Sequence, residues 1–562
     1  MIAAENYQSL GHALSDALTR FESNTAVVEM DRRAERERLS YQDFKCAAKP
    51  VAGFLQSLGV GPESRVAIIM SNQSKWLLAA YASFVRGAIL VPIDYKLTAA
   101  EQLTLLRHSR AQVLFIEHPL WTKLAPHRPD VRVIVSDCPA ADESYGATDW
   151  SAIKGLAFEP DPVQRTRADT ACIVYSSGTG GKPKGCMMSH GNYLAQFTAL
   201  STLFPLQESD RFFSVLPTNH AIDFMCGFIG PLLSGAQVVH QRVLRPEFLL
   251  DTMRQCKITQ MAVVPLLLEA FDRAIREQIE ARGIWARRTV DLLRAFNRRF
   301  TTTRPRYRLS RLLLVPIHKA LGGHLRLLFC GGAMVNPQQA EFLYSCGIGV
   351  VIGYGLTEAG TVVTLNDLQP FKADTVGRPL PGTTVRIAHP DVSGVGEVQV
   401  MGDTVMQGYL DEPELTAQAF EQGWLRTGDQ GRMDASGHLQ LVGRTKNMVV
   451  TAGGKNVYPE DVESVFVELP CKEFAVMASH VVWPTIKLGD DCLVAVANVG
   501  DDPSAFIEAL RLRNLALPDY KRLRGVVLWD SAFPRTASLK LKRQSLAEQM
   551  RERLSEDCVE SL

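Results

Sequence analysis

The sequence predicts an α/β protein with more than one domain, and three observations support this fold class. The chain has 562 residues, which is too many for one hydrophobic core, since single cores stop growing at roughly 250–300 residues. Short apolar runs alternate with helical patterns as far as Ile352, as in sheets built from strand–helix–strand units. After Asp374 the chain changes to short strands and turns, and a smaller unit follows Arg444.

The alternation is clearest in the first quarter of the chain. Strands are predicted at 66–70, 88–94 and 113–116, with helical stretches between them at 76–84 and 99–109. Further apolar strands are predicted at 171–175, 237–239, 261–264, 325–329 and 350–352. Because helices separate consecutive strands, the strands are expected to run parallel.

The sequence pattern changes in the later part of the chain. Segments such as GEVQVMGDTVMQGYL and GHLQLVGR combine short strands with turns. We place a domain boundary near Arg444–Lys446, which gives predicted domains at 1–444 and 445–562. The second domain ends in a segment rich in Lys and Arg.

Composition excludes several classes of protein. With 46% hydrophobic and 22% charged residues, the chain has the balance of an ordinary globular protein. Lys and Arg (61) nearly cancel Asp and Glu (60), so no overall field favours a nucleic acid partner, and none is expected. The cysteines include no CxxC pair, and no basic start followed by an apolar stretch opens the chain. We therefore expect a cytoplasmic protein without a disulfide framework or signal peptide.

One segment, 271–319, stands apart because it carries twelve arginines. Apolar residues recur among them at helical spacing, which predicts a basic amphipathic helix at least up to Pro305. They are Ile284, Trp285, Leu292, Leu293, Phe296 and Phe300. Two interpretations remain equally good: peripheral contact with an anionic membrane that holds the substrate, or a solvated helix packed on the body of the protein.

The sharpest local signal is YSSGTGGKPKG at 175–185, which directly follows the apolar run ACIV. Glycines allow positive φ and close approach, so backbone N–H groups can turn onto a polyphosphate. The loop is not a Walker A motif, because Ser176 holds the opening position and Pro183 follows the first lysine. A flexible surface loop would show the same Gly/Ser composition. The candidate phosphate-binding residues are Ser176, Ser177, Gly178, Thr179, Gly181 and Lys184.

Further motifs follow in a characteristic order. They are LPTNH (216–220), GGA (331–333), YGLTE (354–358), WLRTGD (424–429), GRTKNMVVTAGGKNVYPEDVE (443–463) and PRTASLKLKR (534–543). With the phosphate loop, this set resembles the adenylate-forming superfamily of acyl-CoA synthetases, peptide-synthetase adenylation domains and firefly-type luciferases. The resemblance covers essentially the whole chain, and GGKNVYPEDVE and the basic segment are most similar to long-chain fatty acyl-CoA synthetases.

The resemblance implies both a fold and a set of cofactors. The fold is a large N-terminal domain of packed αβ layers with a small, mobile α+β C-terminal domain, and the cofactors are ATP, Mg²⁺ and CoA. Thr179 and its loop would hold the β- and γ-phosphates. Glu358 would ligate Mg²⁺, a hard ion suited to carboxylate and phosphate oxygens. Thr357 would bond an α-phosphate oxygen, and Tyr354 and Gly355 precede it in the same motif.

The nucleoside would be held by two other motifs. Gly331, Gly332 and Ala333 follow a predicted strand and would form a slot for the adenine. Asp429 matches the carboxylate that binds both ribose hydroxyls, since a carboxylate only accepts hydrogen bonds. Arg444 would support Asp429 from the linker.

The remaining assignments concern the acyl group. Lys540 matches the lysine that bridges the substrate carboxylate and AMP, although an ordinary surface lysine would fit so basic a tail. His220 matches a position near the acyl pocket, with a satisfied core histidine as the alternative. Gly454 lies in the segment used in the thioester half-reaction. Gly180 and Leu539 depart from the family pattern, the first by removing a hydroxyl donor and the second by replacing a glycine.

The predicted function is therefore ATP-dependent activation of a carboxylic acid. The acid, a medium- or long-chain fatty acid, would pass through acyl-AMP to acyl-CoA, with release of AMP and pyrophosphate. One alternative is a fatty acyl-AMP ligase that loads an acyl carrier protein instead of CoA, which the sequence separates poorly from the first. Another is a catalytically inactive binding protein on this fold. The joint presence of Thr179, Glu358, Asp429, Arg444 and Lys540 weighs against inactivity.

Overall fold

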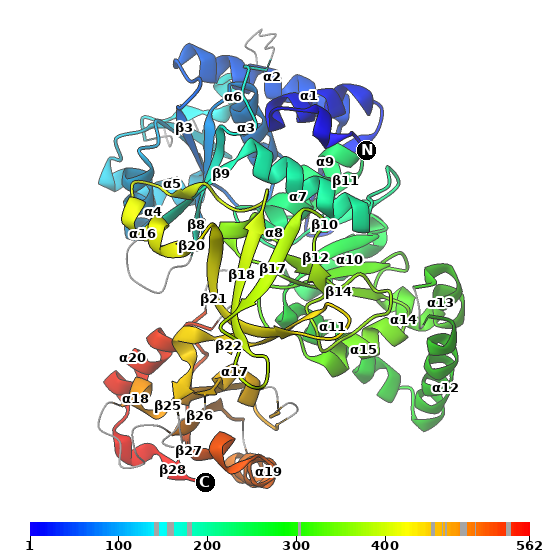
Figure 1. Ribbon diagram of the computed structural model, residues 1–562. Coiled ribbons are helices and arrows are strands. Elements are labelled where there is room, and N and C mark those ends of the chain that lie inside the picture. The colour runs from blue at the N-terminus through cyan, green and yellow to red at the C-terminus, as the bar shows by residue number, and fades with distance from the viewer. Residues whose placement is uncertain are drawn as a thin grey trace. The chain divides into compact units, whose positions relative to one another are not determined.

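The computed structural model describes most of the chain and divides it into two compact units. The described residues are 1–139, 145–153, 162–176, 183–301, 305–450, 456–463, 465–466, 469–483, 492–500, 502–535 and 541–562. Unit 1 comprises 1–373, 377–385 and 400–425, and unit 2 comprises 374–376, 386–399 and 426–562. The chain thus enters unit 2 more than once before its C-terminal segment (Figure 1).

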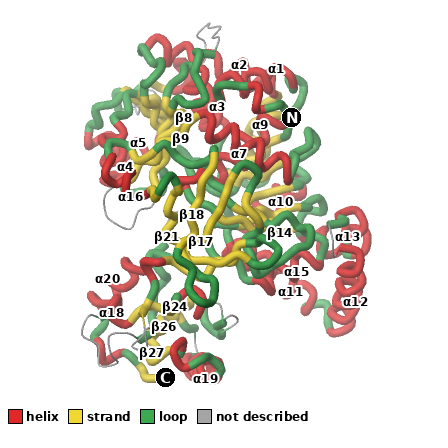
Figure 2. The backbone as a smooth tube through the Cα atoms, in the orientation of Figure 1, coloured by secondary structure: helices red, strands yellow, loops and turns green. Residues whose placement is uncertain are grey.

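The larger sheet of unit 1 has nine strands, of which the middle six are parallel. In spatial order they are β16 (Arg378–Pro379), β15 (Thr364–Leu365), β14 (Gly349–Tyr354), β13 (Leu327–Cys330), β12 (Gln260–Val263), β10 (Arg211–Ser214), β11 (Gln237–Gln241), β1 (Thr25–Asp31) and β2 (Ala34–Ser40). The outer strands β2, β15 and β16 pair antiparallel. Figure 2 shows these strands among the helices that cover them.

A second sheet of eight strands holds the earlier strand–helix–strand units. Its order is β19 (Gly408–Tyr409), β9 (Lys184–Ser189), β8 (Thr170–Ser176), β4 (Ile89–Pro92), β3 (Arg65–Ile69), β5 (Val113–Glu117), β6 (Arg132–Ser136) and β7 (Thr148–Asp149). Strands β8 to β7 are parallel, whereas β9 and β19 pair antiparallel. The predicted parallel strands are therefore confirmed, but they divide between two sheets.

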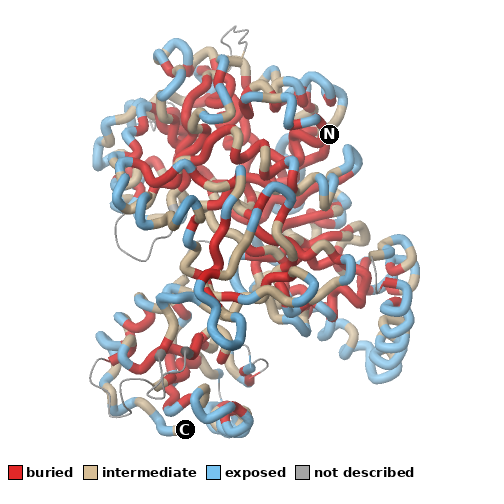
Figure 3. The backbone as a smooth tube through the Cα atoms, viewed as in Figure 1, coloured by how far each residue is buried: buried red, intermediate tan, exposed pale blue. Residues whose placement is uncertain are grey.

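Helix α3 (Ser74–Val85) joins the two sheets into one core. It contacts β1 of the larger sheet and β3 and β4 of the smaller one. Every residue of α3 except Lys75 is buried, as expected for a helix that is apolar on all sides. The red core of unit 1 in Figure 3 includes this layer.

The other helices of unit 1 begin where their sequences place caps. In α2 (Tyr41–Ser57), α4 (Ala99–Ser109) and α7 (His190–Leu203), a Ser or Thr cap and the third helical residue bond reciprocally. The remaining helices are α1 (Leu10–Arg20), α5 (His118–Leu124), α6 (Trp150–Ile153), α8 (Ala221–Phe224), the π-helix η4 (Met225–Ile229), α9 (Gly230–Ser234), α10 (Pro246–Gln255), α11 (Pro265–Glu280), α12 (Ile284–Thr301), α13 (Tyr307–Leu313), α14 (Val315–Ala320), α15 (Pro337–Ser345) and α16 (Pro413–Ala419). Among the described residues, no helix combines the length and the apolar character that crossing a bilayer requires.

Two small sheets follow in the chain. A five-stranded sheet has the order β17 (Thr383–Ala388), β18 (Gly396–Gly402), β21 (Trp424–Met433) and β20 (Phe420–Glu421), with β22 (Leu439–Arg444) paired to β21. A hairpin of β23 (Val449–Val450) and β24 (Asn456–Val457) comes next.

The C-terminal part of unit 2 has an α+β core. Its four-stranded sheet has the order β25 (Glu473–Ala478), β26 (Leu493–Asn498), β27 (Leu523–Leu528) and β28 (Glu560–Ser561). Alternate residues of β26 point to opposite faces, so Leu493 packs with α19 (Pro503–Leu515) and Val494 with α20 (Arg543–Arg553). Short helices α17 (Pro459–Glu463) and α18 (Ser479–Val482) complete the described part. The mixed α/β class with a smaller α+β region is confirmed, while the division at Arg444–Lys446 and its mobility stay predictions.

Candidate active site

Two candidate nucleotide-binding segments leave neighbouring strands of the larger sheet. Gly331, Gly332 and Ala333 directly follow β13. Tyr354 is the last residue of β14, and Gly355 is the first residue after this strand. Parallel strands β13 and β14 are paired directly, so both segments start at the carboxyl edge of the sheet, where ligands of α/β proteins bind.

The glycines in these segments are required by close backbone approach. A Cβ at Gly331 would lie 2.9 Å from the carbonyl oxygen of Gly353, and one at Gly355 would lie 1.8 Å from that of Thr361. Gly332 has a φ of 88°, which favours glycine. Gly332 and Ala333 are exposed, whereas Tyr354 is buried. The structure therefore brings the GGA and YGLTE motifs together at one edge.

Glu358 lies in the 3₁₀ turn η5 (Thr357–Ala359), directly after Tyr354 and Gly355. Its Oε1 accepts a hydrogen bond of 3.1 Å from the hydroxyl of Tyr409 on β19. The Lys184 ammonium, at the start of β9, lies 5.5 Å from the centre of the Tyr409 ring. Tyr409 thus links Glu358 of one motif with Lys184 of the phosphate loop.

Burial and then the neighbouring Glu358 carboxylate raise the pKa of Tyr409 well above its usual range. Its hydroxyl therefore stays protonated and donates to Glu358. Sequence reasoning treated MQGYL only as strand texture and missed Tyr409. Tyr409 reaches the site because β19 pairs with β9, which places Tyr409 opposite Cys186. This strand pairing cannot be read from the MQGYL segment alone.

The carboxylate of Glu358 fits a magnesium site of a particular kind. Both Thr357 and Glu358 are half-buried, and the described residues contain no group of three or more His, Cys, Asp or Glu side chains able to hold a metal. Mg²⁺ is commonly held by one or two carboxylates together with substrate phosphates. A single half-exposed carboxylate beside a phosphate loop is compatible with that mode, and the assignment stays a prediction.

His220 caps the N-terminus of α8 and contacts an acid from the other sheet. Its Nε2 lies 3.4 Å from Asp94 Oδ2, just beyond β4. Burial alone would raise the pKa of Asp94, but the His220 ring and the Lys96 backbone N–H stabilise the carboxylate and lower it. The side chain of His220 is 30% exposed, so it is more open than a fully buried core histidine.

The loop that carries His220 is anchored by a buried polar network. Asp223 Oδ2 accepts hydrogen bonds from the Ser214 hydroxyl (2.6 Å) and the Thr218 hydroxyl (3.0 Å). Asn72 donates to Ser214 and Leu216 and accepts from the Thr218 N–H. Since Ser214 ends β10 and Asn72 follows β3, the network holds the LPTNH segment between the two sheets.

Asp223 itself is unusual within this network. Its side chain is fully buried, and Oδ1 has no hydrogen-bond partner among the residues that the structure describes. Desolvation raises the pKa of Asp223 to about 7, against the hydrogen bonds from Ser214 and Thr218 that lower it. Gly227, in the π-helix η4, allows this carboxylate to approach, because a Cβ there would lie 2.6 Å from Asp223 Oδ2. Sequence reasoning missed Asp223, three residues beyond a motif that it used.

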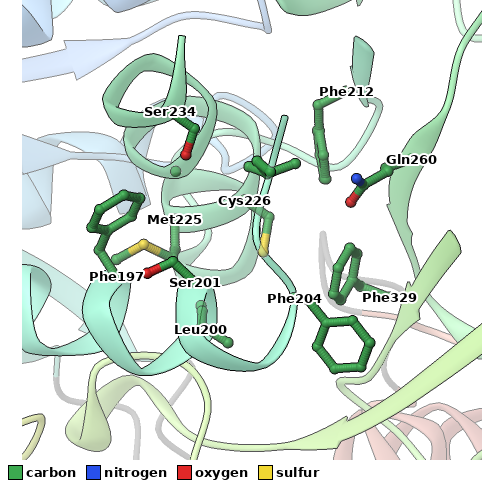
Figure 4. A pocket seen from close by; sticks show the side chains of 12 residues that line it. Phe197, Leu200, Ser201, Phe204, Phe212, Met225, Cys226, Ser234, Gln260 and Phe329 are labelled. Carbon is green, nitrogen blue, oxygen red and sulfur yellow. The ribbon is translucent and has the colours of Figure 1, made fainter. Parts of the chain in front are cut away.

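A narrow apolar cavity of about 40 Å³ lies beside these elements. Figure 4 shows Cys226 of η4 between Met225 on one side and Phe212 and Phe329 on the other. The full lining is Phe197, Leu200, Ser201, Phe204, Leu206, Phe212, Met225, Cys226, Gly230, Ser234, Gln260 and Phe329. Burial and the nearby Asp223 raise the pKa of the Cys226 thiol to about 12, so it is neutral. The cavity runs from the helices that follow His220 to β13, whose end carries Gly331.

Unit 2 contains the other candidate nucleotide residues. Asp429 on β21 and Arg444 on β22 are cross-strand partners, and Arg444 Nε donates to Asp429 Oδ1 at 2.9 Å. Asp429 is buried, whereas the Arg444 side chain is 55% exposed. The predicted support of Asp429 by Arg444 is thus present as a contact. Lys446, in the 3₁₀ turn η6 (Thr445–Asn447), is exposed.

Several sequence candidates lie outside the described residues. They are Ser177, Gly178, Thr179, Gly181, Gly454 and Lys540, together with the side chain of Ser176 and the departures at Gly180 and Leu539. The roles assigned to them stay predictions.

Comparison with known proteins defines the class. A family model described as AMP-binding enzyme matches residues 14–410, and the chain belongs to this family. It is 29% identical over 538 residues to the long-chain-fatty-acid–CoA ligase FadD15 of Mycobacterium bovis, with 88% of each chain covered. It is 28% identical over 441 residues to a feruloyl-CoA synthase of an Amycolatopsis species, which covers 77% of this chain and 78% of the relative.

Solved structures agree with the fold. An anthranilate CoA ligase in complex with anthranoyl-AMP has a TM-score of 0.78 at 21% identity and covers 98% of this chain and 99% of its own. The o-succinylbenzoate CoA synthetase of Bacillus subtilis, bound to ATP and magnesium, has a TM-score of 0.74 at 22% identity, covering 95% and 98%.

Within the family, the protein is an AMP-forming acyl-CoA synthetase, an acid–thiol ligase. Its cofactors are ATP, Mg²⁺ and CoA, and its substrate is a carboxylic acid.

Proposed function

We propose that the acid activated by this synthetase is a medium- or long-chain fatty acid. The observation that carries the proposal is the lining of the cavity beyond His220, where aromatic, aliphatic and sulfur-containing side chains outnumber the few uncharged polar groups. None of its lining residues in the described part of the chain carries a charge. Such a lining favours an alkyl tail over a polar acid, because burying an unpaired polar group costs free energy.

The carboxylate end of the acid reacts at the carboxyl edge of the larger sheet. There its oxygen attacks the α-phosphorus of ATP, the bond to the bridging oxygen breaks, and pyrophosphate leaves. Negative charge develops on the α-phosphate and on the leaving group, so donors and cations must be placed around them. Thr357 would donate to an α-phosphate oxygen, and Glu358 would hold Mg²⁺, which supplies positive charge to the phosphates when it is bound. Thr179 and Lys184 bind the β- and γ-phosphates, and Lys540 bridges the carboxylate and the α-phosphate.

The nucleoside is held by the remaining candidates. Gly331, Gly332 and Ala333 present backbone to the adenine, and the exposed, Cβ-poor edge suits the approach of a flat base. Asp429 accepts from the ribose hydroxyls, and the hydrogen bond from Arg444 orients its carboxylate. In the second half-reaction the CoA thiolate attacks the acyl carbonyl beside Gly454, and AMP leaves.

We also propose peripheral contact with a membrane through residues 271–319. Acids with long alkyl tails partition into bilayers, so an enzyme that uses them gains from working at that surface. The arginines and apolar residues of this segment support the contact.

The substrate proposal is tested by pyrophosphate release with saturated acids of graded length, an aromatic acid and a hydroxylated acid. Each is measured with CoA, with an acyl carrier protein, and without a thiol. The proposal expects kcat/KM to rise with alkyl length, and product to form with CoA and not with the carrier protein. Preference for the aromatic or hydroxylated acid would overturn it.

A substitution in the cavity lining tests directly whether the alkyl tail of the acid enters this cavity. Cys226→Phe fills part of the space and should lower kcat/KM for long acids by about tenfold or more, while acids too short to reach it lose less. Cys226→Ala is the matched control, since it enlarges the cavity without adding a polar group. If the Phe variant lowers activity equally for all lengths, the tail does not enter this cavity.

A further inference from the structure

Helix α12 carries an exposed apolar stripe that the fold does not use. Four large apolar side chains lie on it with high exposure: Trp285 (75%), Leu292 (71%), Phe296 (49%) and Phe300 (41%). At 100° per residue, these positions fall within one narrow sector of the helix. Phe296 and Phe300 also pack edge to face, with ring centres 4.9 Å apart. Figure 3 shows α12 exposed along most of its length.

The helix is attached to unit 1 through a different face. Its two buried side chains are Asn297 and Thr301. The Asn297 amide donates to the Ser345 carbonyl (3.0 Å), and its oxygen accepts from the Ser310 hydroxyl (2.8 Å). Tyr344 donates to the Thr301 carbonyl. These inward positions lie roughly 100° around the helix from the stripe, so folding leaves the larger apolar residues outside.

The charge on the rest of α12 is almost entirely positive. At 100° per residue, Arg288 and Arg299 border the stripe, whereas Arg287 and Arg298 lie on the opposite face of the helix. All four arginines are exposed, and Asp291 is the one acidic residue of this helix. Asp291 already pairs with Arg294 at 3.2 Å. Arg288 extends over the Trp285 ring, 5.5 Å from its centre, so a cation lies directly at the edge of the stripe.

A cleft of about 420 Å³ opens beside α12 on the polar side of the helix, away from the stripe. It is lined by Asp291, Arg294, Ala295, Arg298, Arg299 and Ser345. Three of its six lining residues are arginines, and guanidinium groups match phosphate oxygens in geometry and charge.

Exposed leucines elsewhere lack this combination. On α19, Leu512 and Leu515 are 65% and 66% exposed, but the neighbouring Arg511 is paired with Glu560 at 3.0 Å. The aromatic residue of that helix, Phe506, is buried, so no exposed ring lies with these leucines among the described residues of α19. The pair therefore serves as a control of matched exposure.

We propose that α12 lies in the interfacial plane of an anionic membrane, with its apolar stripe among the acyl chains and its arginines at lipid phosphates. A Trp/Phe/Leu face bordered by arginines is the pattern of interfacial helices, and arginine–phosphate attraction accounts for preference for anionic lipid. The membrane contact proposed above for residues 271–319 is thereby assigned to the apolar stripe of α12 and the arginines of that helix. It does not depend on which acid the enzyme activates.

The test is co-sedimentation of the full chain with vesicles of phosphatidylcholine alone or mixed with phosphatidylglycerol, at low and at moderate salt. The wild type should bind the mixed vesicles, and more weakly as salt rises. Leu292→Asp with Phe296→Asp should weaken binding by about tenfold or more. Leu512→Asp with Leu515→Asp, which adds the same charge on α19, should bind as the wild type does.

Arginine variants separate the two contributions. Arg288→Gln with Arg299→Gln, at the two arginines that border the stripe, should lower binding to the mixed vesicles by about tenfold and remove most of the salt dependence. All variants should keep the circular dichroism spectrum and the turnover of a short, water-soluble acid, which shows that the enzyme is folded and active.

Four results would overturn the proposal. The wild type could fail to bind mixed vesicles, or bind pure phosphatidylcholine equally well. The stripe variant could pellet like the wild type. Sedimentation velocity could show a wild-type dimer that the stripe variant converts to monomer, which would assign the face to a second copy of the chain. Vesicle binding does not require turnover, so its failure is distinct from failure of the substrate proposal.

Discussion

Tyr409 connects two residues that come from motifs more than 170 positions apart in the chain. Its hydroxyl donates to Glu358 and its ring faces the Lys184 ammonium. The hydrogen bond from Tyr409 therefore orients the Glu358 carboxylate, which we propose as the ligand of Mg²⁺. Partners of this kind commonly fix the orientation of a metal-binding carboxylate.

Glu358→Gln is expected to weaken Mg²⁺-dependent adenylation strongly, by roughly 100-fold at limiting Mg²⁺. An amide keeps the shape and the acceptor for Tyr409 but loses the charge that holds the ion. Tyr409→Phe should have a smaller effect, because the carboxylate remains and only its orientation is freed. Initial rates of pyrophosphate release over a range of Mg²⁺ concentrations measure both. Wild-type behaviour of the Gln variant at low Mg²⁺ would exclude Glu358 from the site.

Asp223 predicts a pH dependence of stability. Its pKa is about 7 in the folded protein against an ordinary value of 3.8. Between these values the unfolded chain has lost the proton that the folded protein keeps, so stability falls as pH rises, and the loss is complete above about pH 7. This group alone costs the wild type about 2–3 kcal/mol between pH ~5 and pH ~8.

Asp223→Asn removes that titration while leaving an oxygen for the Ser214 and Thr218 hydroxyls. Relative to the wild type, the variant should therefore resist urea better at pH ~8 than at pH ~5. Unfolding midpoints followed by tryptophan fluorescence at the two pH values provide the comparison. A wild-type–variant difference that does not change with pH would show that Asp223 is ionised in the folded protein.

Sequence motifs indicated candidate site residues, but not the residues that contact them in the fold. Glu358, His220 and Asp429 stand in short ordered patterns that the sequence displays. Tyr409 and Asp223 act through strand pairing and burial, which depend on segments distant in the chain. A single sequence gives the chemistry of a side chain but not whether water reaches it, and burial is what raises the pKa of Asp223.

At the scale of elements, periodicity predicted strands and helices well but not their grouping. The strand at 66–70 and that at 237–239 show the same apolar pattern, yet β3 and β11 belong to different sheets. Alternation with helices indicates parallel pairing, but it does not say which strands pair. Likewise, the basic amphipathic pattern predicted α12 but not that Asn297 and Thr301 would be its buried side chains.

We predict that the turn between β14 and η5 must keep its backbone position for adenylation. Gly355→Ala would place a Cβ 1.8 Å from the Thr361 carbonyl oxygen, so the backbone around Thr357 and Glu358 must shift. A displacement of that size should lower adenylation by roughly 100-fold, with a smaller loss of thermal stability.

Gly500→Ala is the matched control, since a Cβ there meets nothing within 4 Å. Activity and melting temperature should both stay near wild-type values for that variant. Full adenylation by Gly355→Ala would mean that the turn tolerates a shift, and that its geometry does not position the site.

At the scale of the whole molecule, the two units do not follow chain order, and their boundaries pass through strands of the five-stranded sheet. Parts of β18 and β21, with all of β22, group with the C-terminal segment, although our predicted boundary at Arg444 assigned them to the N-terminal domain. The grouping of residues into two units describes one conformation of the chain. It does not show which residues rotate during catalysis. The sequence motifs indicate where a hinge belongs, and the hinge stays a prediction.

The two half-reactions give the reason to expect a hinge. Lys540 must reach the α-phosphate while the carboxylate attacks, whereas the thiol must later reach the acyl carbonyl beside Gly454. We expect one surface to be replaced by the other through rotation about Lys446. Lys540→Ala should accordingly abolish acyl-AMP formation and largely spare thioester formation from supplied acyl-AMP. Equal loss of both steps would contradict this division of roles.

Lys446→Pro tests the rotation directly. Lys446 lies in the short 3₁₀ turn 445–447, and the φ typical of 3₁₀ turns, about −50 to −70°, suits proline. The variant should therefore keep its fold while losing the φ freedom that a hinge needs. We expect one half-reaction to continue and the other to fall by roughly 100-fold, measured as pyrophosphate release for adenylation and as thioester formation from supplied acyl-AMP. Lys446→Ala, which removes the side chain but leaves φ free, should retain both steps. If the proline variant performs both steps at the rates of the alanine variant, the chain does not rotate at this residue.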